Sequence, residues 1–201
     1  MSETQLQHVE RVLLHYKPRK KLIRPFLKRS AVAIILQEVQ REVRILMIKR
    51  AERDGDPWSG HMAFPGGRMD SDDRHGFDVA VRETEEEIGL TLGEADPCIG
   101  RLSEIMTHPQ IIRRPMVVSP YIFRLDRDVE FNPNYEVAEV LWVPLEFLLN
   151  RSNVEKMVWE RKGVEIPLPC YRYEGRQIWG LSLMMLDEFL GLLGSRRPAR
   201  W

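Results

Sequence analysis

Residues 82–90 read RETEEEIGL, and their charge pattern is the most informative feature of the chain. On a helix, with about 100° between successive residues, Glu83, Glu86 and Glu87 share one face at positions i, i+3 and i+4. Carboxylates crowded at this spacing repel one another unless a cation lies among them. Mg2+ or Mn2+ is the expected cation, because hard divalent ions prefer oxygen ligands. A charge-assisted contact from Arg82 can hold one of the glutamates in position.

The helix that carries these acids is expected from Gly76 to Ile88 and ends at Gly89, a natural C-cap. Its other face is an apolar stripe that we expect to pack on a sheet. The stripe consists of Phe77, Ala80, Val81, Thr84 and Ile88.

The sequence Phe64-Pro65-Gly66-Gly67 lies before this helix, in a Gly-, Pro- and Asp-rich stretch that predicts a long loop over residues 51–73. Adjacent glycines permit unusual backbone angles and a close approach of the backbone to a ligand. The carbonyl of Gly67 is a candidate to complete the metal shell. A glutamate-rich helix face exposed to solvent, without a metal, is the simpler alternative. Loop and helix together favour a site for a metal-bound phosphate anhydride.

These segments resemble the signature of the Nudix hydrolases, G-x5-E-x7-R-E-U-x-E-E-x-G-U, in which U is a bulky apolar residue. The matching residues are Arg82, Glu83, Glu86, Glu87, Gly89 and Leu90. Thr84 occupies a U position. The first half departs more, because Arg74 stands where glutamate is expected and Gly67 lies one residue too far upstream. Asp72 or Asp73 is a candidate replacement for that acid, or the acid is dispensable.

The resemblance implies catalytic roles for Arg82, Glu83 and Glu86, and metal ligation by Glu83, Glu86, Glu87 and Gly67. Glu86 and Glu87 would be the main ligands. Glu83 would be a ligand or the base that takes a proton from the attacking water, and Arg82 would orient it.

The stretch Gly60 to Gly67 is similar to the G-x3-F-P-G-G end of a motif found in the coenzyme A diphosphatases of this superfamily. The start of that motif is similar to Leu46 to Arg50. Ala51 and Gly55 depart from it, the segment to Gly60 is one residue longer, and Arg53 could serve from a shifted register. The substrate-binding residues expected on this basis and from phosphate recognition by paired arginines are Arg50, Arg53, Phe64, Gly66, Arg113 and Arg114.

The implied activity is Mg2+-dependent cleavage of the diphosphate bond of coenzyme A or its derivatives, giving 3′,5′-ADP and 4′-phosphopantetheine. Hydrolysis of ADP-ribose or another dinucleotide is the alternative. Many ADP-ribose hydrolases of this superfamily carry a proline about 15 residues after the signature, which we call the Nudix box. Here Ile105 and Met106 stand at that place and Pro109 follows slightly late. The aromatic-proline signature of NADH diphosphatases is absent from the sequence. A non-catalytic nucleotide sensor with this fold is the alternative from another class.

Other residues stay open between a site role and an ordinary structural role. His61 and His108 are loop histidines that could border the site. Trp58 could stack on a base or anchor its loop. Glu136 and Glu139 are candidates for a further acid from a late loop, or are exposed acids beside a strand. Met184 and Met185 belong to a core face or a dimer interface.

Helices and strands are expected in an order that favours an α+β protein. Helices are predicted over residues 3–16, from Pro144, and over 181–193; strands are predicted over 31–39, 43–49, 99–106, 116–125, 139–143, 154–161 and 166–173. The first two strands form one hairpin and the last two form another, around Lys162-Gly163. The resemblance implies the Nudix fold, an α/β/α sandwich around a mixed β-sheet. The predicted organisation is an N-terminal helix and basic linker (1–29), a Nudix domain (30–194) and a flexible tail (195–201).

Composition excludes several classes of protein. The chain has 201 residues, and 30 basic residues balance 30 acidic ones, so binding of nucleic acid by bulk charge is not expected. The first residues do not read as a secretory signal, and no apolar run predicts a membrane span. Cys98 and Cys170 are too few for a disulfide scaffold and suit a cytoplasmic location.

A small-molecule nucleotide is the expected partner, without nucleic acid or membrane, and a homodimer is compatible with the sequence. The segment Lys17 to Arg29, with seven basic residues and no acid, reads as a solvated linker or as an attractant for an anionic substrate.

Overall fold

The computed structural model describes residues 3–55, 58–107, 115–161 and 163–194. Strands β1 (Lys28–Val39) and β2 (Glu42–Arg50) form the antiparallel hairpin predicted from the sequence. Gln40 and Arg41 connect them and have φ angles of 53° and 71°. Positive φ at both central residues matches the right-handed twist of the strands, which is why such two-residue turns are favoured in hairpins.

The main sheet has eight strands and is mixed. The strand order is β3-β2-β1-β7-β5, with β4 also paired to β1, β6 to β7 and β8 to β2. Beyond the hairpin its strands are β3 (Met62–Ala63), β4 (Gly66–Arg68), β5 (Cys98–Arg101), β6 (Ile105–Met106), β7 (Met116–Arg124) and β8 (Val137–Pro144). The pairing of β1 with β7 is parallel, and the other pairings are antiparallel.

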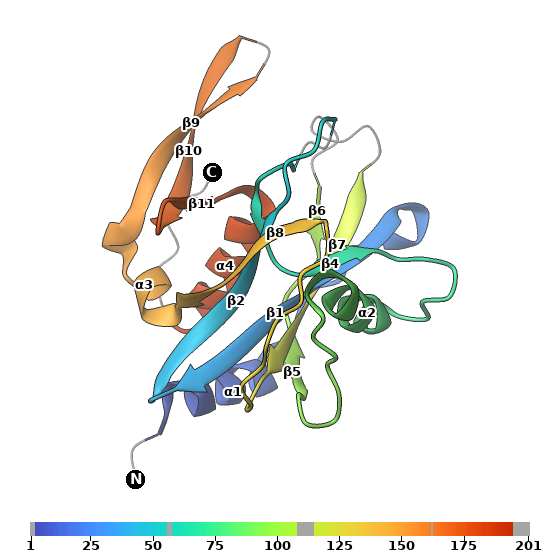
Figure 1. The fold of residues 1–201 in the computed structure, drawn as a ribbon, viewed down its shortest axis with the longest axis vertical. Helices are drawn as coiled ribbons and strands as arrows, with labels where there is room; N and C mark the ends of the chain where they lie inside the picture. The colour runs from blue at the N-terminus through green and yellow to red at the C-terminus, as the bar shows by residue number, and fades with distance from the viewer. Residues whose placement is uncertain (1–2, 56–57, 108–114, 162, 195–201) are drawn as a thin grey trace.

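Both faces of this sheet are covered, which explains the unbroken apolar run in β1. Ala33 and Ile35 face one core together with helix α2 (Gly76–Ile88), whereas Ile34 and Leu36 face the other. That second core also contains helices α1 (Gln5–His15) and α4 (Gly180–Leu192). Figure 1 shows α2 on one side of the sheet and α1 and α4 on the other. The predicted α/β/α sandwich is confirmed.

Helix α1 is part of this packed body. Thr4 caps it, and its side-chain oxygen accepts a hydrogen bond from the backbone of Gln7. Val9 is fully buried in the core shared with α4. The division into an N-terminal segment and a domain beginning at residue 30 stays a prediction.

A second, three-stranded sheet follows the main one. It has the order β11-β10-β9, from β9 (Val154–Arg161), β10 (Val164–Tyr173) and β11 (Arg176–Ile178). The predicted second hairpin is therefore confirmed, although Lys162 lies outside the described residues, and β11 was not predicted. In Figure 1 the β9–β10 hairpin extends away from the main sheet. The helix α3 (Leu145–Leu149) precedes it, and Pro144 is its N-cap.

Three predicted details were wrong. The strand expected over residues 99–106 is two strands, because the backbone N–H of Glu104 donates to the carbonyl of Arg19 instead of pairing with a strand. On α2 the fully buried residue near the helix start is Val79, whereas Phe77 is 40% exposed and lies against the rings of Tyr121 and Phe123. The loop over residues 51–73 contains the short strands β3 and β4. Within the described ranges, no helix is long and apolar enough to cross a bilayer.

Candidate active site

The site is built on α2, whose two ends are fixed by local contacts. At the N-terminus, the Asp78 carboxylate accepts hydrogen bonds from the backbone N–H groups of Arg74 (3.1 Å) and His75 (3.0 Å). An acid here also stabilises the positive end of the helix dipole. At the C-terminus, Gly89 has φ of 70°, and its N–H donates to the carbonyl of Glu85. The predicted helix bounds and C-cap are confirmed.

Two glycines bring the loop before α2 against the glutamate face. Strand β4 pairs with β1 so closely that a Cβ on Gly66 would lie 2.3 Å from the carbonyl oxygen of Ala31. A Cβ on Gly67 would lie 2.1 Å from Glu83 Oε1. Real Cβ atoms do not approach other atoms so closely, so Gly66 is required beside the β1 backbone, and a side chain at position 67 would displace the Glu83 carboxylate.

Glu87 is the most buried acid of the site. Its residue exposure is 3%, and Oε2 accepts a hydrogen bond of 2.9 Å from the backbone N–H of Gly66. Burial raises the pKa of the Glu87 carboxyl to about 7, and the neighbouring carboxylates of Glu83 and Glu136 act in the same direction. The Gly66 hydrogen bond and the Arg50 guanidinium oppose the rise. The simpler alternative, a face of glutamates exposed to solvent, therefore does not hold for Glu87, which lies under the glycine loop.

Glu83 is partly buried and contacts Arg82. Burial raises the pKa of the Glu83 carboxyl, Arg82 lowers it, and the carboxylate of Glu86 raises it again. When burial and other acids raise the pKa of a carboxyl, a cation that binds nearby stabilises its charged form.

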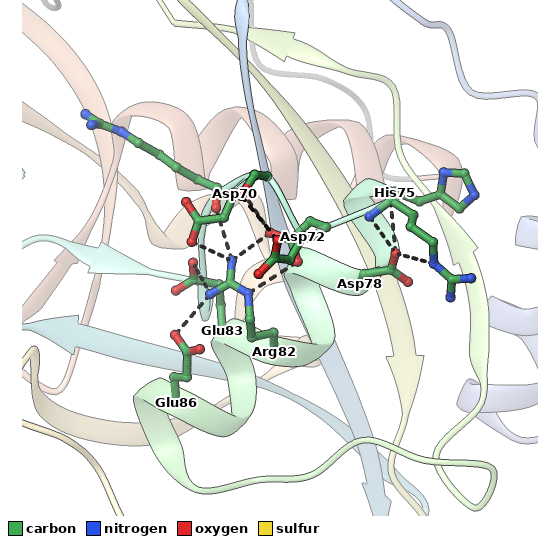
Figure 2. A network of polar contacts seen from close by, with 11 residues as sticks. Asp70, Asp72, His75, Asp78, Arg82, Glu83 and Glu86 are labelled. Carbon is green, nitrogen blue, oxygen red and sulfur yellow. Dashed lines mark hydrogen bonds and ion pairs between the residues drawn. The ribbon is translucent and has the colours of Figure 1, made fainter.

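Arg82 is the centre of a network of ion pairs (Figure 2). Its Nη1 lies 3.0 Å from both Glu83 Oε1 and Glu86 Oε2. On its other edge, Nε and Nη2 donate to the two carboxylate oxygens of Asp73 at 3.3 and 3.0 Å. Nη2 also donates to the carbonyl of Arg68. The sequence predicted that Arg82 would hold one glutamate; the structure gives it two glutamates and Asp73, and these contacts raise its pKa.

The sequence left open whether Asp72 or Asp73 replaces the expected acid. The paired hydrogen bonds from Arg82 to Asp73 identify Asp73 as the one that belongs to this network. Asp73 makes the paired contact, with a side chain only 6% exposed, and the pKa of its carboxyl is lowered chiefly by the hydrogen bond from Arg82. Arg74, at the expected glutamate position, points away from this network; its side chain is 85% exposed and lies 3.8 Å from Asp78. Figure 2 shows Asp78 near the start of α2 and Arg82 beside Glu83 and Glu86 farther along the helix.

Thr84, the polar residue at an apolar signature position, is fully buried and satisfied within its own helix. Its hydroxyl donates to the carbonyl of Ala80 at 2.6 Å. A buried hydroxyl with such a partner avoids the cost of an unsatisfied polar group.

Glu136 belongs to the site region, and Glu139 does not. The backbone N–H of Asn134 donates to the carbonyl of Glu87, and the Asn134 side chain accepts from the N–H of Glu136. Glu136 thus lies near enough to affect the pKa of Glu87. Glu139 is paired with Arg176 at 2.6 Å, which lowers the pKa of its carboxyl.

The expected substrate-binding residues have different surroundings. Arg50 is near Glu87, where its charge lowers the pKa of that acid. Arg53 pairs with Glu136 at 3.2 Å and lies over the ring of Tyr135, 4.6 Å from its centre. Phe64 is 2% exposed and packs in the core, so its side chain cannot contact a ligand in this arrangement.

The other residues whose role the sequence left undecided either pack against neighbouring side chains or lie outside the described residues. Trp58 packs against the core, and the ring of His61 lies 4.7 Å from that of Trp179. Both placements favour the structural roles. Arg113, Arg114 and His108 lie outside the described residues. Sequence reasoning missed Asp70, whose carboxylate lies 3.8 Å from Arg82, and Tyr135; neither has a motif that marks it.

The donor set suits a hard cation in chemistry but is not assembled around one point. Across the described ranges, no three acidic, histidine or cysteine side chains form a ready metal site. The reason is that Arg82 holds Glu83 and Glu86 while Glu87 turns to Gly66. Burial raises the pKa values of Glu83 and Glu87, although Arg82 lowers the first and Arg50 lowers the second. Oxygen donors of this kind fit Mg2+ or Mn2+.

Comparison with known proteins agrees with the fold. Residues 27–163 match the NUDIX domain. The Arabidopsis thaliana protein "Nudix hydrolase 15, mitochondrial" is 31% identical over 182 residues, which cover 86% of this chain and 61% of that protein. The mouse "Peroxisomal coenzyme A diphosphatase NUDT7" is 29% identical over 118 residues, which cover 57% of this chain and 47% of that protein. The chain therefore spans less than two thirds of the length of either relative.

Solved structures with the same fold are more distant in sequence. A C. elegans Ap4A hydrolase superposes with a TM-score of 0.54 at 15% identity, covering 85% of this chain and all of that one. A MutT/nudix family protein from Enterococcus faecalis gives 0.57 at 17% identity, covering 95% and 70%. At these identities the likeness concerns the fold alone. Because the NUDIX domain matches more than half of the chain, and the box residues lie together on α2, the protein belongs to the Nudix family of hydrolases.

Proposed function

We propose that the chain hydrolyses the diphosphate bond of a nucleoside diphosphate linked to another group, with coenzyme A or its derivatives as the substrate. The observation that carries the proposal is the contact between the glycine loop and α2, in which Gly66 binds Glu87 and Gly67 packs on Glu83. That contact joins the box to the Gly60–Gly67 motif similar to coenzyme A diphosphatases.

Glu83, Glu86, Glu87 and the carbonyl of Gly67 would hold Mg2+ or Mn2+. When bound, the cation would neutralise the diphosphate and make a water more acidic. Hydrolysis would join the oxygen of a water molecule to one phosphorus and break the bond from this phosphorus to the bridging oxygen, which would leave two phosphate monoesters. Glu83 is the candidate to take the proton of the water, because its pKa is raised and its side chain is only 16% exposed.

Arg82 would orient the glutamates on the two turns of α2. Its guanidinium binds Glu83 and Glu86 on one side and is held by Asp73 on the other. Arg50 supplies positive charge beside Glu87 and suits the diphosphate, as the sequence predicted for it. Arg53, Arg113 and Arg114 remain candidates for contacts with phosphate.

Coenzyme A is favoured over ADP-ribose or another dinucleotide by two facts. The motif over residues 60–67 is similar to that subfamily, and a relative at 29% identity is named a coenzyme A diphosphatase. Retention of the three box glutamates argues against a sensor that binds a nucleotide without cleaving it. A cytoplasmic location and a homodimer stay predictions.

The test is incubation of the full chain with Mg2+ and, separately, coenzyme A, ADP-ribose, NADH, diadenosine polyphosphates and nucleoside triphosphates, followed by mass spectrometry. We expect 3′,5′-ADP and 4′-phosphopantetheine from coenzyme A, and no product after chelation of the metal. Cleavage of a different compound would keep the reaction class and overturn the substrate. Nucleotide binding without any cleavage, with Mg2+ or Mn2+, would favour the sensor.

A further inference from the structure

The segment between α1 and β1, Lys17 to Arg29, is the most polarised stretch of the chain. It holds seven of the 30 basic residues and none of the 30 acids, so the other residues together carry a net charge of −7. We call it the basic segment. The zero net charge of the chain conceals this asymmetry.

Large apolar side chains protrude from the same segment. Leu22 is 95% exposed, Phe26 is 88% exposed and Ile23 is 50% exposed. Single exposed apolar residues are common on protein surfaces, but three within five positions form a patch that requires an explanation. Figure 1 shows this part of the chain, in blue before β1, projecting from the body at the end of the sheet near β4 and β7.

Contacts with a buried acid hold the backbone of the basic segment in place. Glu104 is 3% exposed; one of its oxygens lies 2.9 Å from Arg24 Nη1, and the other accepts a 2.7 Å hydrogen bond from the N–H of Lys21. The N–H of Glu104 donates to the carbonyl of Arg19. Leu22 and Ile23 lie between these anchors, so the fold itself presents them to solvent.

The exposed residues Leu22, Ile23 and Phe26 form an apolar tip, and most of the positive charges around it have no acidic partner in the described ranges. Apart from Arg24, the basic residues of the segment are exposed and form no ion pair with an acid in the described ranges. They are Lys17, Arg19, Lys20, Lys21, Lys28 and Arg29. Six such charges beside a large apolar tip complement a surface that is anionic outside and apolar beneath.

We propose that the basic segment docks on an anionic lipid bilayer, with Leu22 and Phe26 inserted among the acyl chains and the lysines and arginines at the headgroups. Apolar anchors combined with basic residues are the usual means by which a protein without a spanning helix binds such a surface. Exposed apolar side chains with basic residues on either side suit a lipid surface, because its charged headgroups lie above an apolar interior.

Docking would bring the candidate active site close to the bilayer. The segment leads directly into β1, and Ser30 to Val32 of that strand pair with β4, which contains Gly66 and Gly67. The backbone N–H of Met69, just after β4, donates to the carbonyl of Arg29. This proposal departs from the expectation of no membrane partner, because the sequence does not show that Leu22 and Phe26 are left unburied.

The test is sedimentation of the full chain with vesicles of phosphatidylcholine alone or mixed with phosphatidylserine, at about 0.1 M salt, where charges separated by about 10 Å still interact. We expect binding to the mixed vesicles only. Lys20→Glu with Lys21→Glu should weaken it by at least tenfold, since each basic residue contributes about fivefold. Leu22→Ser with Phe26→Ser should weaken it similarly.

Matched controls are Lys156→Glu and Val158→Ser, at exposed positions on β9, which should bind as the unaltered chain does. All four variants should keep the rate of diphosphate hydrolysis with a soluble substrate. The proposal is overturned if the unaltered chain stays in the supernatant, if it binds neutral vesicles equally well, or if the segment variants sediment as the controls do. Binding of soluble polyglutamate without binding of vesicles would assign the segment to an acidic protein partner instead, and would also overturn it.

Discussion

Arg82 and Asp73 set the geometry of the candidate site at the scale of single residues. Arg82 contacts two box glutamates, and Asp73 occupies the opposite edge of its guanidinium. The sequence identified Arg82 through its signature position. The sequence could not distinguish Asp72 from Asp73, because a difference of one residue in the loop decides which carboxylate reaches the Arg82 guanidinium.

Asp73→Asn is expected to reduce stability by roughly 1–3 kcal/mol, since it removes a hydrogen-bonded charge pair with a side chain that is little exposed. The pKa of the Asp73 carboxyl is lowered in the folded state from its usual 3.8, so its contribution is present above about pH 4 and is lost as the pH falls through the folded value. Urea unfolding of both proteins at neutral and acid pH measures this. Asp72→Asn is the control, and an equal loss in both variants would contradict the assignment.

Gly67→Ala is expected to lower the rate of hydrolysis by about 100-fold, because a displacement of about 1 Å in a positioned group can cost that much. Its Cβ would lie 2.1 Å from Glu83 Oε1, so the carboxylate must move. Gly93→Ala is the matched control, since a Cβ there meets no atom within 4 Å. Steady-state rates at saturating substrate distinguish the two, and an unimpaired Gly67→Ala enzyme would show that Glu83 is not held as described.

At the scale of elements, α2 was predicted almost to the residue. Its polar and apolar periodicity, the following glycine and the box all pointed to the same bounds, and the structure has Gly76–Ile88. The sequence did not reveal that Glu87 is buried. That burial results from β4, a three-residue strand whose pairing with β1 depends on close backbone approach at two glycines, which no local pattern encodes.

Gly89→Ala is expected to destabilise the protein by about 1–2 kcal/mol, because a residue with a Cβ is strained at positive φ. The φ angle is 70°, and the added Cβ would lie 3.0 Å from Cβ of Asn132. The Asn132 N–H donates to the last residue of α2, so the 132–136 loop should loosen with the helix end. Thermal unfolding and amide exchange at residues 86–89 measure the effect; full protection there would contradict it.

At the scale of the whole molecule, two cores on opposite faces of one sheet make α1 a structural part of the fold. Alternate residues of β1 belong to the two cores. In the sequence this strand appears only as an unbroken apolar run, which indicates that both faces of the strand are buried. The second sheet, β11-β10-β9, was predicted as a hairpin, but its third strand has three residues and no signal of its own.

Val9→Ala is expected to lower the melting temperature of the whole protein in a single transition, at a cost of about 1–2 kcal/mol. Val9 is fully buried between α1 and the sheet, whereas Leu14, on the same helix, is 80% exposed. Leu14→Ala should therefore change little. Calorimetry that showed a separate early transition in Val9→Ala would indicate that residues 1–29 unfold independently.

The central claim is that the glutamates of α2 carry out metal-dependent hydrolysis of a diphosphate. The most direct measurement compares coenzyme A cleavage by Glu86→Gln with that by Glu85→Gln, a neighbouring exposed glutamate that accepts a hydrogen bond from Thr91. The account predicts that Glu86→Gln folds normally and loses at least 100-fold in rate, as is common when a group that stabilises the transition state is removed, while Glu85→Gln keeps its activity. Equal activity in the two variants would contradict it.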